Sequence, residues 1–298
     1  MKRIILAILL ISAILLVGCD GEDTTTTAGS GAFIGGTQGI MATFEPFGVV
    51  EDGVYSIFDA ETIPIEVTLN NKGEYEIQPG DITVELKGPS MDFTGIPSLA
   101  LKNAGTIETV SELLTIGGEE TLTFSSDAKY SQPVNGAIDR EWFANFDYNY
   151  ETYLIVPEVC LKEDLTDDRV CTIDGAKTYF VSGAPITITS VEESTAGKGI
   201  MALKIKVSNV GSGKVTKPGD DFGVQERVAY AIDDINWECK QGGKLGEARL
   251  INGEAEIICK LKEALPEGTL ATKQLGLTIS YKYRDIIQET LRIKESVE

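Results

Sequence analysis

The sequence has no histidine and is poor in basic residues. Its 298 residues include 26 Lys and Arg against 46 Asp and Glu, which gives a formal net charge of −20. The absence of histidine excludes a Ser-His-Asp triad, a Cys-His pair and any zinc site with an imidazole ligand. The acidic balance lacks the basic footprint that nucleic-acid binding requires, so we expect no nucleic-acid partner. An enzyme of this composition would have to work with carboxylates, Lys, Tyr or Ser.

Long hydrophobic runs are also scarce, and the clearest one lies at the N-terminus. Lys2 and Arg3 precede 14 uncharged residues, Ile4 to Val17. At about 1.5 Å per residue this run spans about 21 Å, which is less than the ~30 Å hydrocarbon core of a bilayer. A short apolar run after a positively charged start predicts a secretory signal peptide over residues 1–18.

Cys19 follows this run directly, and the stretch Leu16-Val17-Gly18-Cys19 resembles the lipobox of envelope lipoproteins. The resemblance implies cleavage before Cys19 and a lipidated cysteine as the new N-terminus, with membrane lipid as its partner. An ordinary cleaved signal peptide with a chance cysteine and an uncleaved anchor are the alternatives. Residues 19–38 are rich in Thr, Gly, Ser and acid, which predicts a flexible linker. We therefore expect an exported protein, lipid-anchored at the outer face of the cell membrane or in the cell envelope.

Four cysteines remain after the signal: Cys160, Cys171, Cys239 and Cys259. They form two close pairs, and neither pair has the C-x-x-C spacing of zinc or thioredoxin-like motifs. Because disulfides persist in the oxidising conditions that an exported protein meets, we predict the bonds Cys160–Cys171 and Cys239–Cys259. Four reduced thiols and a metal site of four thiolates are the alternatives. No cofactor is expected.

Apolar and polar residues alternate in several segments, whereas no long segment after residue 18 has helical periodicity. Residues 63–69, 203–207 and 275–283 place an apolar side chain at every second position. This period is typical of half-buried antiparallel strands. Together with turn signals at short intervals, it predicts an all-β protein built from antiparallel β-sandwiches.

Two stretches are similar to each other, which indicates an internal duplication. "IPIEVTLNNKGEYEIQPGD" aligns with "MALKIKVSNVGSGKVTKPGD", and Tyr148-Asn-Tyr150 with Tyr281-Lys-Tyr283. The similar offsets predict a duplicated domain rather than a short solenoid repeat. In both copies we expect Asn-x-Gly to form a turn through positive φ, and Pro-Gly-Asp to form another. The sequence thus predicts one sandwich over residues 39–159, a disulfide-stapled connector over 160–183 and a second sandwich over 184–298.

The strands "VTLNNKG" and "IKVSNVG", each with its Asn-x-Gly, resemble the Ig-like CARDB modules of cell-surface and S-layer-associated proteins, many of them archaeal. The resemblance covers only part of each repeat. It implies two tandem Ig-like sandwiches with a structural or adhesive role, and it brings no catalytic residues. The cysteine-stapled connector has no counterpart in the resemblance.

The stretch "DREWFANFDYNYE" gathers aromatic and acidic side chains. Tyr148 and Tyr150 belong to an expected strand and are interpreted as sheet packing. Trp142 and Phe143 lie just before that strand, so they are candidate contacts for a glycan or another ligand. The acids of the same stretch leave a glycosidase with two carboxylates as a further alternative.

Four acids cluster in the connector: Glu163, Asp164, Asp167 and Asp168. Hard cations prefer carboxylate and carbonyl oxygens, which makes these residues candidate Ca²⁺ ligands. They lack the spacing of an EF-hand, and a solvated acidic surface is the alternative interpretation.

These features predict a membrane-anchored cell-surface protein with a structural, adhesive or scaffolding role and no catalytic activity. Its expected partners are membrane lipid, through Cys19, and other envelope proteins or glycans. The alternative functions are those of a surface glycan- or ligand-binding protein and of a carboxylate-based glycosidase.

Overall fold

The computed structural model describes residues 31–173 and 175–296. Within them, the regular elements are β-strands and one short 3₁₀ turn, η1 (Ser90–Asp92), which confirms the predicted all-β class. The expected signal peptide and Cys19 lie outside the described residues. No helix in the described ranges is long and apolar enough to cross a membrane.

The strands, in chain order, are β1 (Ile40–Phe44), β2 (Val49–Glu51), β3 (Val54–Phe58), β4 (Thr62–Asn71), β5 (Ile82–Lys87), β6 (Phe93–Thr94), β7 (Ala100–Lys102), β8 (Glu119–Tyr130), β9 (Ala137–Lys162), β10 (Phe180–Val181), β11 (Ile186–Gly197), β12 (Ile200–Asn209), β13 (Lys214–Thr216), β14 (Glu226–Ile232), β15 (Trp237–Gln241), β16 (Lys244–Leu245), β17 (Glu247–Leu250), β18 (Glu254–Leu261) and β19 (Leu270–Lys294).

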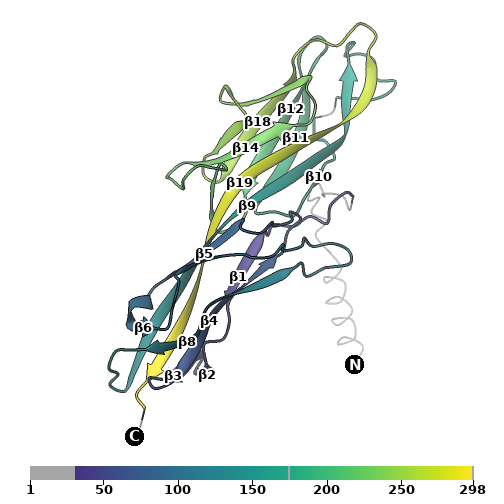
Figure 1. Ribbon diagram of the computed structural model, residues 1–298. Helices are drawn as coiled ribbons and strands as arrows, with labels where there is room; N and C mark the ends of the chain where they lie inside the picture. The colour runs from purple at the N-terminus through teal and green to yellow at the C-terminus, as the bar shows by residue number, and fades with distance from the viewer. Residues whose placement is uncertain (1–30, 174, 297–298) are drawn as a thin grey trace, which may run out of the picture.

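Two very long strands, β9 and β19, form the axis of the molecule. They pair antiparallel along almost their whole length, from Ala137 opposite Lys294 to Lys162 opposite Leu270. With 26 residues in β9, at about 3.3 Å per residue, this ribbon is about 85 Å long. Figure 1 shows the ribbon crossing the entire molecule, with one lobe built around each half of it.

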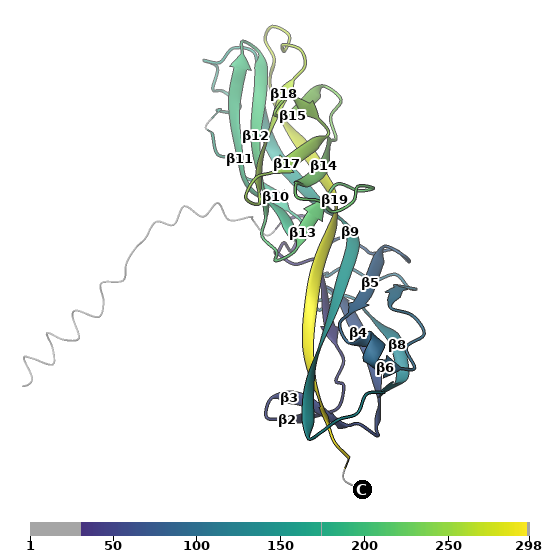
Figure 2. The same cartoon turned by 90° about the vertical axis from the view of Figure 1, so that its left-hand side faces the viewer.

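Each lobe is a β-sandwich that uses one half of this ribbon. In lobe 1, β5 pairs with β9 and β3 pairs with β19, and a second sheet of order β1-β4-β8-β6 covers them. In lobe 2, β14 and β17 extend the ribbon, and a sheet of order β11-β12-β18-β15-β16 covers it. Figure 2 shows both lobes along the continuous ribbon. The inward side chains of both lobes form one continuous hydrophobic core.

The two sandwiches do not follow one another simply along the chain, because both long strands belong to both lobes. β19 begins in lobe 2 and ends in lobe 1, where Leu291–Lys294 pairs in parallel with Tyr55–Phe58 of β3. The expected boundary between residues 159 and 160 lies inside β9. No Gly or Pro occurs between residues 277 and 294, so nothing in the sequence interrupts the second long strand at the lobe boundary.

The internal repeat appears in the structure as an approximate two-fold relation about the middle of the ribbon. Tyr150 lies opposite Tyr281, and Tyr148 lies opposite Tyr283. Each tyrosine of one copy therefore lies opposite the tyrosine of the other copy that is not its equivalent in the repeat. We call this region the waist. It comprises Tyr148, Tyr150, Tyr281 and Tyr283, together with the loops after β4 and β12 that contact them.

Candidate functional site

The waist holds the same hydrogen-bond network twice. The Tyr150 hydroxyl donates to the Asn71 side-chain oxygen over 3.1 Å, and the Tyr283 hydroxyl donates to that of Asn209 over the same distance. Each asparagine amide then donates to a carbonyl four residues later, that of Tyr75 over 2.7 Å or of Gly213 over 3.0 Å. The duplicated Asn and Tyr positions thus fix the loop after β4 and the loop after β12 to the long strands.

The glycine of each Asn-x-Gly motif serves this network, but not by the expected mechanism. Neither Gly73 nor Gly211 has a positive φ, so the predicted left-handed turn is absent. A Cβ atom on either glycine would collide with the hydroxyl of its tyrosine, Tyr150 or Tyr283. The motif therefore needs glycine because the tyrosine hydroxyl lies too close to the backbone for a Cβ atom to fit. In the Pro-Gly-Asp turns, by contrast, the glycines at 80 and 219 have φ values of +86° and +83°, as predicted.

Burial keeps the four waist tyrosines neutral. Loss of solvation raises the pKa of Tyr148 and Tyr281 well above the usual value of a phenol, and raises that of Tyr150 as well. The pKa of Tyr283 is raised to about 12, again chiefly by burial. These hydroxyls are therefore structural hydrogen-bond donors near neutral pH and not acid–base groups.

The waist also binds the end of the expected linker. The Glu74 carboxylate accepts hydrogen bonds from the backbone N–H groups of Ile34, Gly35 and Gly183, over 2.7 to 2.8 Å. Phe33 stacks on Tyr153, with ring centroids 6.5 Å apart. The expected flexible linker extends to residue 38, but its described residues are already held against the middle of the molecule from Phe33 onward.

The connector is stapled as predicted and encloses a buried lysine. Cys160 is bonded to Cys171, and Cys239 to Cys259. Lys162 is only 2% exposed, and its ammonium group donates to Asp168 over 2.6 Å and lies 3.5 Å from the carbonyl oxygen of Cys171. The connector loop therefore folds over this one lysine.

The candidate Ca²⁺ ligands of the connector are not brought together. Glu163 pairs with Lys198, and Asp164 bonds Thr166 two residues on. Asp167 forms a two-point ion pair with Arg169, whose hydrogen bonds lower the pKa of this carboxyl to about 2, and Asp168 bonds Lys162. No group of three or more metal-ligating side chains occurs within residues 31–173 and 175–296.

Trp142 is a core residue, which contradicts its interpretation as a surface contact. It is 0% exposed and lies 5.2 Å from the ring of Phe93 and 6.3 Å from that of Phe47, measured between centroids. The reason is that β9 begins at Ala137, before Trp142, so strand alternation turns Trp142 inward with Tyr148. Phe143 is on the opposite face and is half-buried, opposite Lys87 of β5.

Three acids of the stretch around Trp142, namely Asp139, Asp147 and Glu151, bond to side chains of the neighbouring long strand. Asp139 lies opposite Arg292 and bonds it over 2.7 Å, and Asp147 lies opposite Arg284 and bonds it over 2.6 Å. Glu151 accepts a hydrogen bond from Ser280 on β19. Each carboxylate is therefore used to hold the two long strands together.

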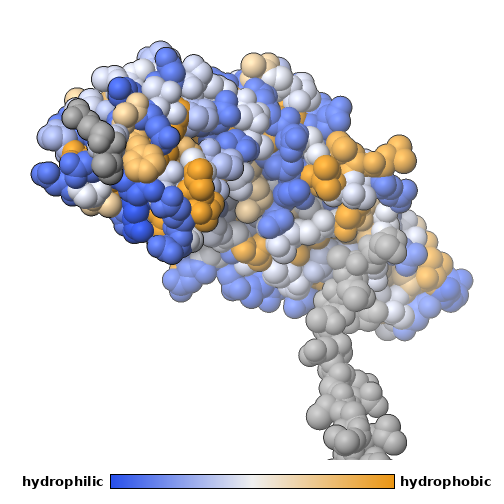
Figure 3. Space-filling model, turned by 90° about the horizontal axis from the view of Figure 1, so that it is seen from below, coloured by the Kyte–Doolittle hydropathy of each residue, from blue (hydrophilic) through white to orange (hydrophobic). Residues whose placement is uncertain are grey.

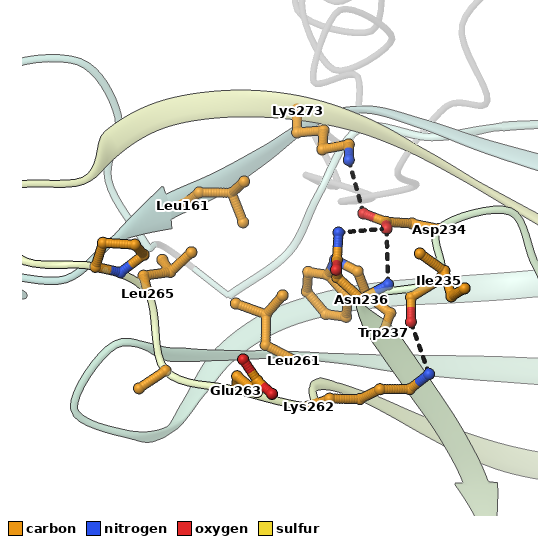
Figure 4. A pocket seen from close by; sticks show the side chains of 12 residues that line it. Leu161, Asp234, Ile235, Asn236, Trp237, Leu261, Lys262, Glu263, Leu265 and Lys273 are labelled. Carbon is orange, nitrogen blue, oxygen red and sulfur yellow. Dashed lines mark hydrogen bonds and ion pairs between the residues drawn. The ribbon is translucent and has the colours of Figure 1, made fainter.

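One pocket of about 370 Å³ lies at the end of lobe 2, away from the waist. Figure 4 shows the side chains that line it. Apolar side chains line much of it, among them Leu161, Leu261 and Leu265, together with the buried ring of Trp237. At its edge, Lys273 points to Asp234, with the ammonium nitrogen 2.7 Å from the carboxylate oxygen. Sequence reasoning missed this pocket, because no motif indicates that the ends of β9 and β18 meet.

In comparisons with known proteins, no family model and no curated protein matches the chain. The waist and the end pocket are therefore interpreted from their own geometry. The waist offers a buried, fully engaged network and a docked N-terminal segment. The end pocket offers a hollow with a partly apolar lining and one ion pair at its edge.

Proposed function

We propose that the chain is a non-catalytic, membrane-anchored surface protein that acts as a rigid scaffold. The observation that carries this proposal is the β9–β19 ribbon, which crosses both lobes without a break. Independent domains usually meet at a linker that few contacts cross. Here two hydrogen-bonded strands and the packed rings of Tyr148 and Tyr283, with centroids 5.6 Å apart, cross the junction. Both lobes should therefore move as one body.

The anchor in this proposal is the lipidated Cys19 that the lipobox resemblance implies. The docking of Ile34 and Gly35 on Glu74 supports a tether that leaves the body at its middle. Both ends of the rod then extend away from the attachment point. Each end becomes available as a contact surface for other envelope proteins or glycans, which suits a structural or adhesive role like that of CARDB-type modules.

The use of charge supports a role without catalysis. Several acids of the long strands and of the connector are engaged by partners of the same chain, as with Asp147 on Arg284 and Asp168 on Lys162. Glu193 is fully buried, accepts a hydrogen bond from the Cys160 backbone and pairs with Lys177 at 2.9 Å. Carboxylates held in this way stabilise the fold and are poorly placed to act on a substrate.

The anchor is tested in cells that export the chain, by comparing the wild type with Cys19→Ser. The wild type should incorporate an alkyne-tagged fatty acid, sediment with membranes and be cleaved by protease added to intact cells. Cys19→Ser should lose the label and the membrane association. Formation of its two disulfides shows that the variant still folds. A mass spectrum showing Met1 or an unmodified Cys19 in the mature wild-type protein would contradict the proposal.

A second candidate function is ligand binding at the end pocket, because a hollow of this size with both apolar and polar lining suits a small amphipathic molecule. Leu265 is partly exposed at its wall, so Leu265→Arg should block it. A glycan or metabolite that binds the wild type should lose affinity for this variant and keep it for Leu245→Arg, whose exposed site lies outside the lining. Equal binding to both variants would exclude the pocket as the binding site.

A further inference from the structure

We propose that the face around the waist rests directly on the lipid bilayer, and that the loop of residues 111–117 inserts Leu113 and Ile116 into its interface. This inference rests on the proposed anchoring through Cys19. We call residues 111–117 the waist loop. Four observations support a lipid contact here: the exposure of the loop, its order, its place beside the tether and the short length of that tether.

The waist loop holds two aliphatic side chains in solvent. Leu113 is 99% exposed and Ile116 is 63% exposed. The loop is nevertheless ordered, since the Ser111 hydroxyl accepts from the N–H of Leu114 and the Leu114 carbonyl accepts from those of Ser111 and Gly117. These hydrogen bonds hold the loop in a conformation that exposes Leu113 and Ile116 to solvent. A surface that contacts only water does not require such exposed apolar side chains.

The loop lies beside the segment through which the tether reaches the body. Lys72 contacts both, because its backbone N–H donates to the Gly39 carbonyl over 2.8 Å and its ammonium group donates to the Ile116 carbonyl over 3.1 Å. The docked segment adds Ile34, which is 56% exposed. Figure 3 shows hydrophobic side chains at several places on this view of the surface, including the side where the described chain begins.

The second repeat places a similar side chain on the other side of the waist. The Asn71 N–H donates to the carbonyl of Gly118, directly after the waist loop, and the Asn209 N–H donates to that of Gly253. The turn that ends at Gly253 carries Ile251, which is 61% exposed. The two-fold relation thus gives the waist one apolar contact on each lobe.

The tether is short compared with the rod. Ile34 is 15 positions after Cys19. A flexible chain of that length has a mean reach of about 5–6 Å × √15, or roughly 21 Å, against about 85 Å for the ribbon. An anchor at the middle of a rod with so short a tether keeps the waist close to the lipid surface. The bilayer is then the apolar phase closest to Leu113 and Ile116, whatever other partners the protein has.

The contact should be apolar in origin and not electrostatic. Glu112 is exposed within the loop, Glu119 is exposed just after it, and the whole chain carries a net charge of −20. Anionic headgroups therefore repel this face, and salt screens the repulsion. This predicts closer contact with phosphatidylcholine than with phosphatidylglycerol at low ionic strength.

The test uses the full lipidated chain, purified in detergent and reconstituted into phosphatidylcholine vesicles that contain a nitroxide lipid. A polarity-sensitive fluorophore is placed at Leu113→Cys or at Met91→Cys, a control position in lobe 1 that is 89% exposed. We expect a blue shift and loss of emission at position 113 and no change at position 91. Both positions are too exposed for the substitution to disturb the core, and circular dichroism of each variant verifies the fold.

The outcomes separate the inference from the anchor. If the label at 113 behaves like the one at 91 while the protein remains on the vesicles, the lipid contact is wrong and the anchor stands. If the purified protein carries no lipid and does not associate with the vesicles, both are wrong. Stronger quenching in phosphatidylglycerol than in phosphatidylcholine would also overturn the inference, because it would show a contact governed by charge.

Discussion

The hydroxyl of Tyr150 lies 3.1 Å from the side-chain oxygen of Asn71, in the buried middle of the molecule. Tyr283 and Asn209 repeat this contact at the same distance in the other lobe. The pair links the end of a strand in the covering sheet to the long strand beneath it. Both copies of this contact lie at the junction between the lobes. They therefore join the two repeats that are visible in the sequence into one body.

Replacing these asparagines should destabilise the whole molecule. Asn71→Ala removes the acceptor of the Tyr150 hydroxyl and the donor to the Tyr75 carbonyl at a buried position, so we expect a loss of about 1–3 kcal/mol in the free energy of unfolding. Asn209 is less buried, so Asn209→Ala should lower the free energy of unfolding by less. Urea unfolding provides the measurement, with the exposed Asn149→Ala as a control that should change little. An effect of Asn71→Ala no larger than that of the control would contradict the role of the network.

The buried phenols predict a loss of stability in alkali. The pKa of Tyr283 in the fold is about 12, above the ~10 of an exposed phenol, so the fold favours the neutral form. The stabilisation that the fold gains from neutral Tyr283 is complete below about pH 10. It is lost as the pH rises towards 12, because the tyrosine ionises first in the unfolded chain. The waist tyrosines should then ionise only as the chain unfolds, which ultraviolet absorbance and circular dichroism measure together. Ionisation of these four near pH 10 in a fully folded chain would be inconsistent with their burial.

Trp142 and Phe143 should differ sharply in their effect on stability. Trp142→Ala removes a fully buried ring from the core and should cost about 3–5 kcal/mol. Phe143→Ala removes a half-buried ring from the outer face and should cost clearly less. Thermal or urea unfolding of both variants makes the comparison. Equal, small losses would restore the surface interpretation of Trp142.

Glu74 should control the docking of the tether. Glu74→Ala removes the acceptor of three backbone N–H groups, so the segment around Ile34 should become sensitive to limited proteolysis. Hydrogen exchange at Ile34 and Gly35 should accelerate at the same time. The exposed neighbour Glu76→Ala is the matched control, and an unchanged cleavage pattern in Glu74→Ala would show that other contacts hold the segment.

Alternation and turn residues were sufficient to predict much of the fold. They indicated the strands that include Val67, Ile205 and Ile279, the all-β class and the repeat, because period two is a local property of half-buried strands. Both disulfides followed from spacing. The sharing of β9 and β19 between lobes did not, since which strand pairs with which over a long distance is decided by the whole core and not by any local pattern.

The errors at individual sites have local causes. In the sequence-based prediction Trp142 lies just before a strand, but Asp139 and Asp147 are outward positions of that same strand, paired with arginines. The Asn-x-Gly pattern predicts a positive φ at Gly73, whereas the structure requires the absence of a Cβ atom there. The end pocket and the docking on Glu74 depend on contacts between distant segments, which a single sequence does not display.

The central claim is that the two repeats form one rigid body, and a distance distribution between the lobes tests it most directly. Spin labels at Asp127→Cys on β8 and Lys260→Cys on β18, both exposed positions, place one probe on each lobe. Double electron–electron resonance should give one narrow distance that does not change with salt. A broad distribution, or several distances in exchange, would show that the lobes move independently and would contradict the account.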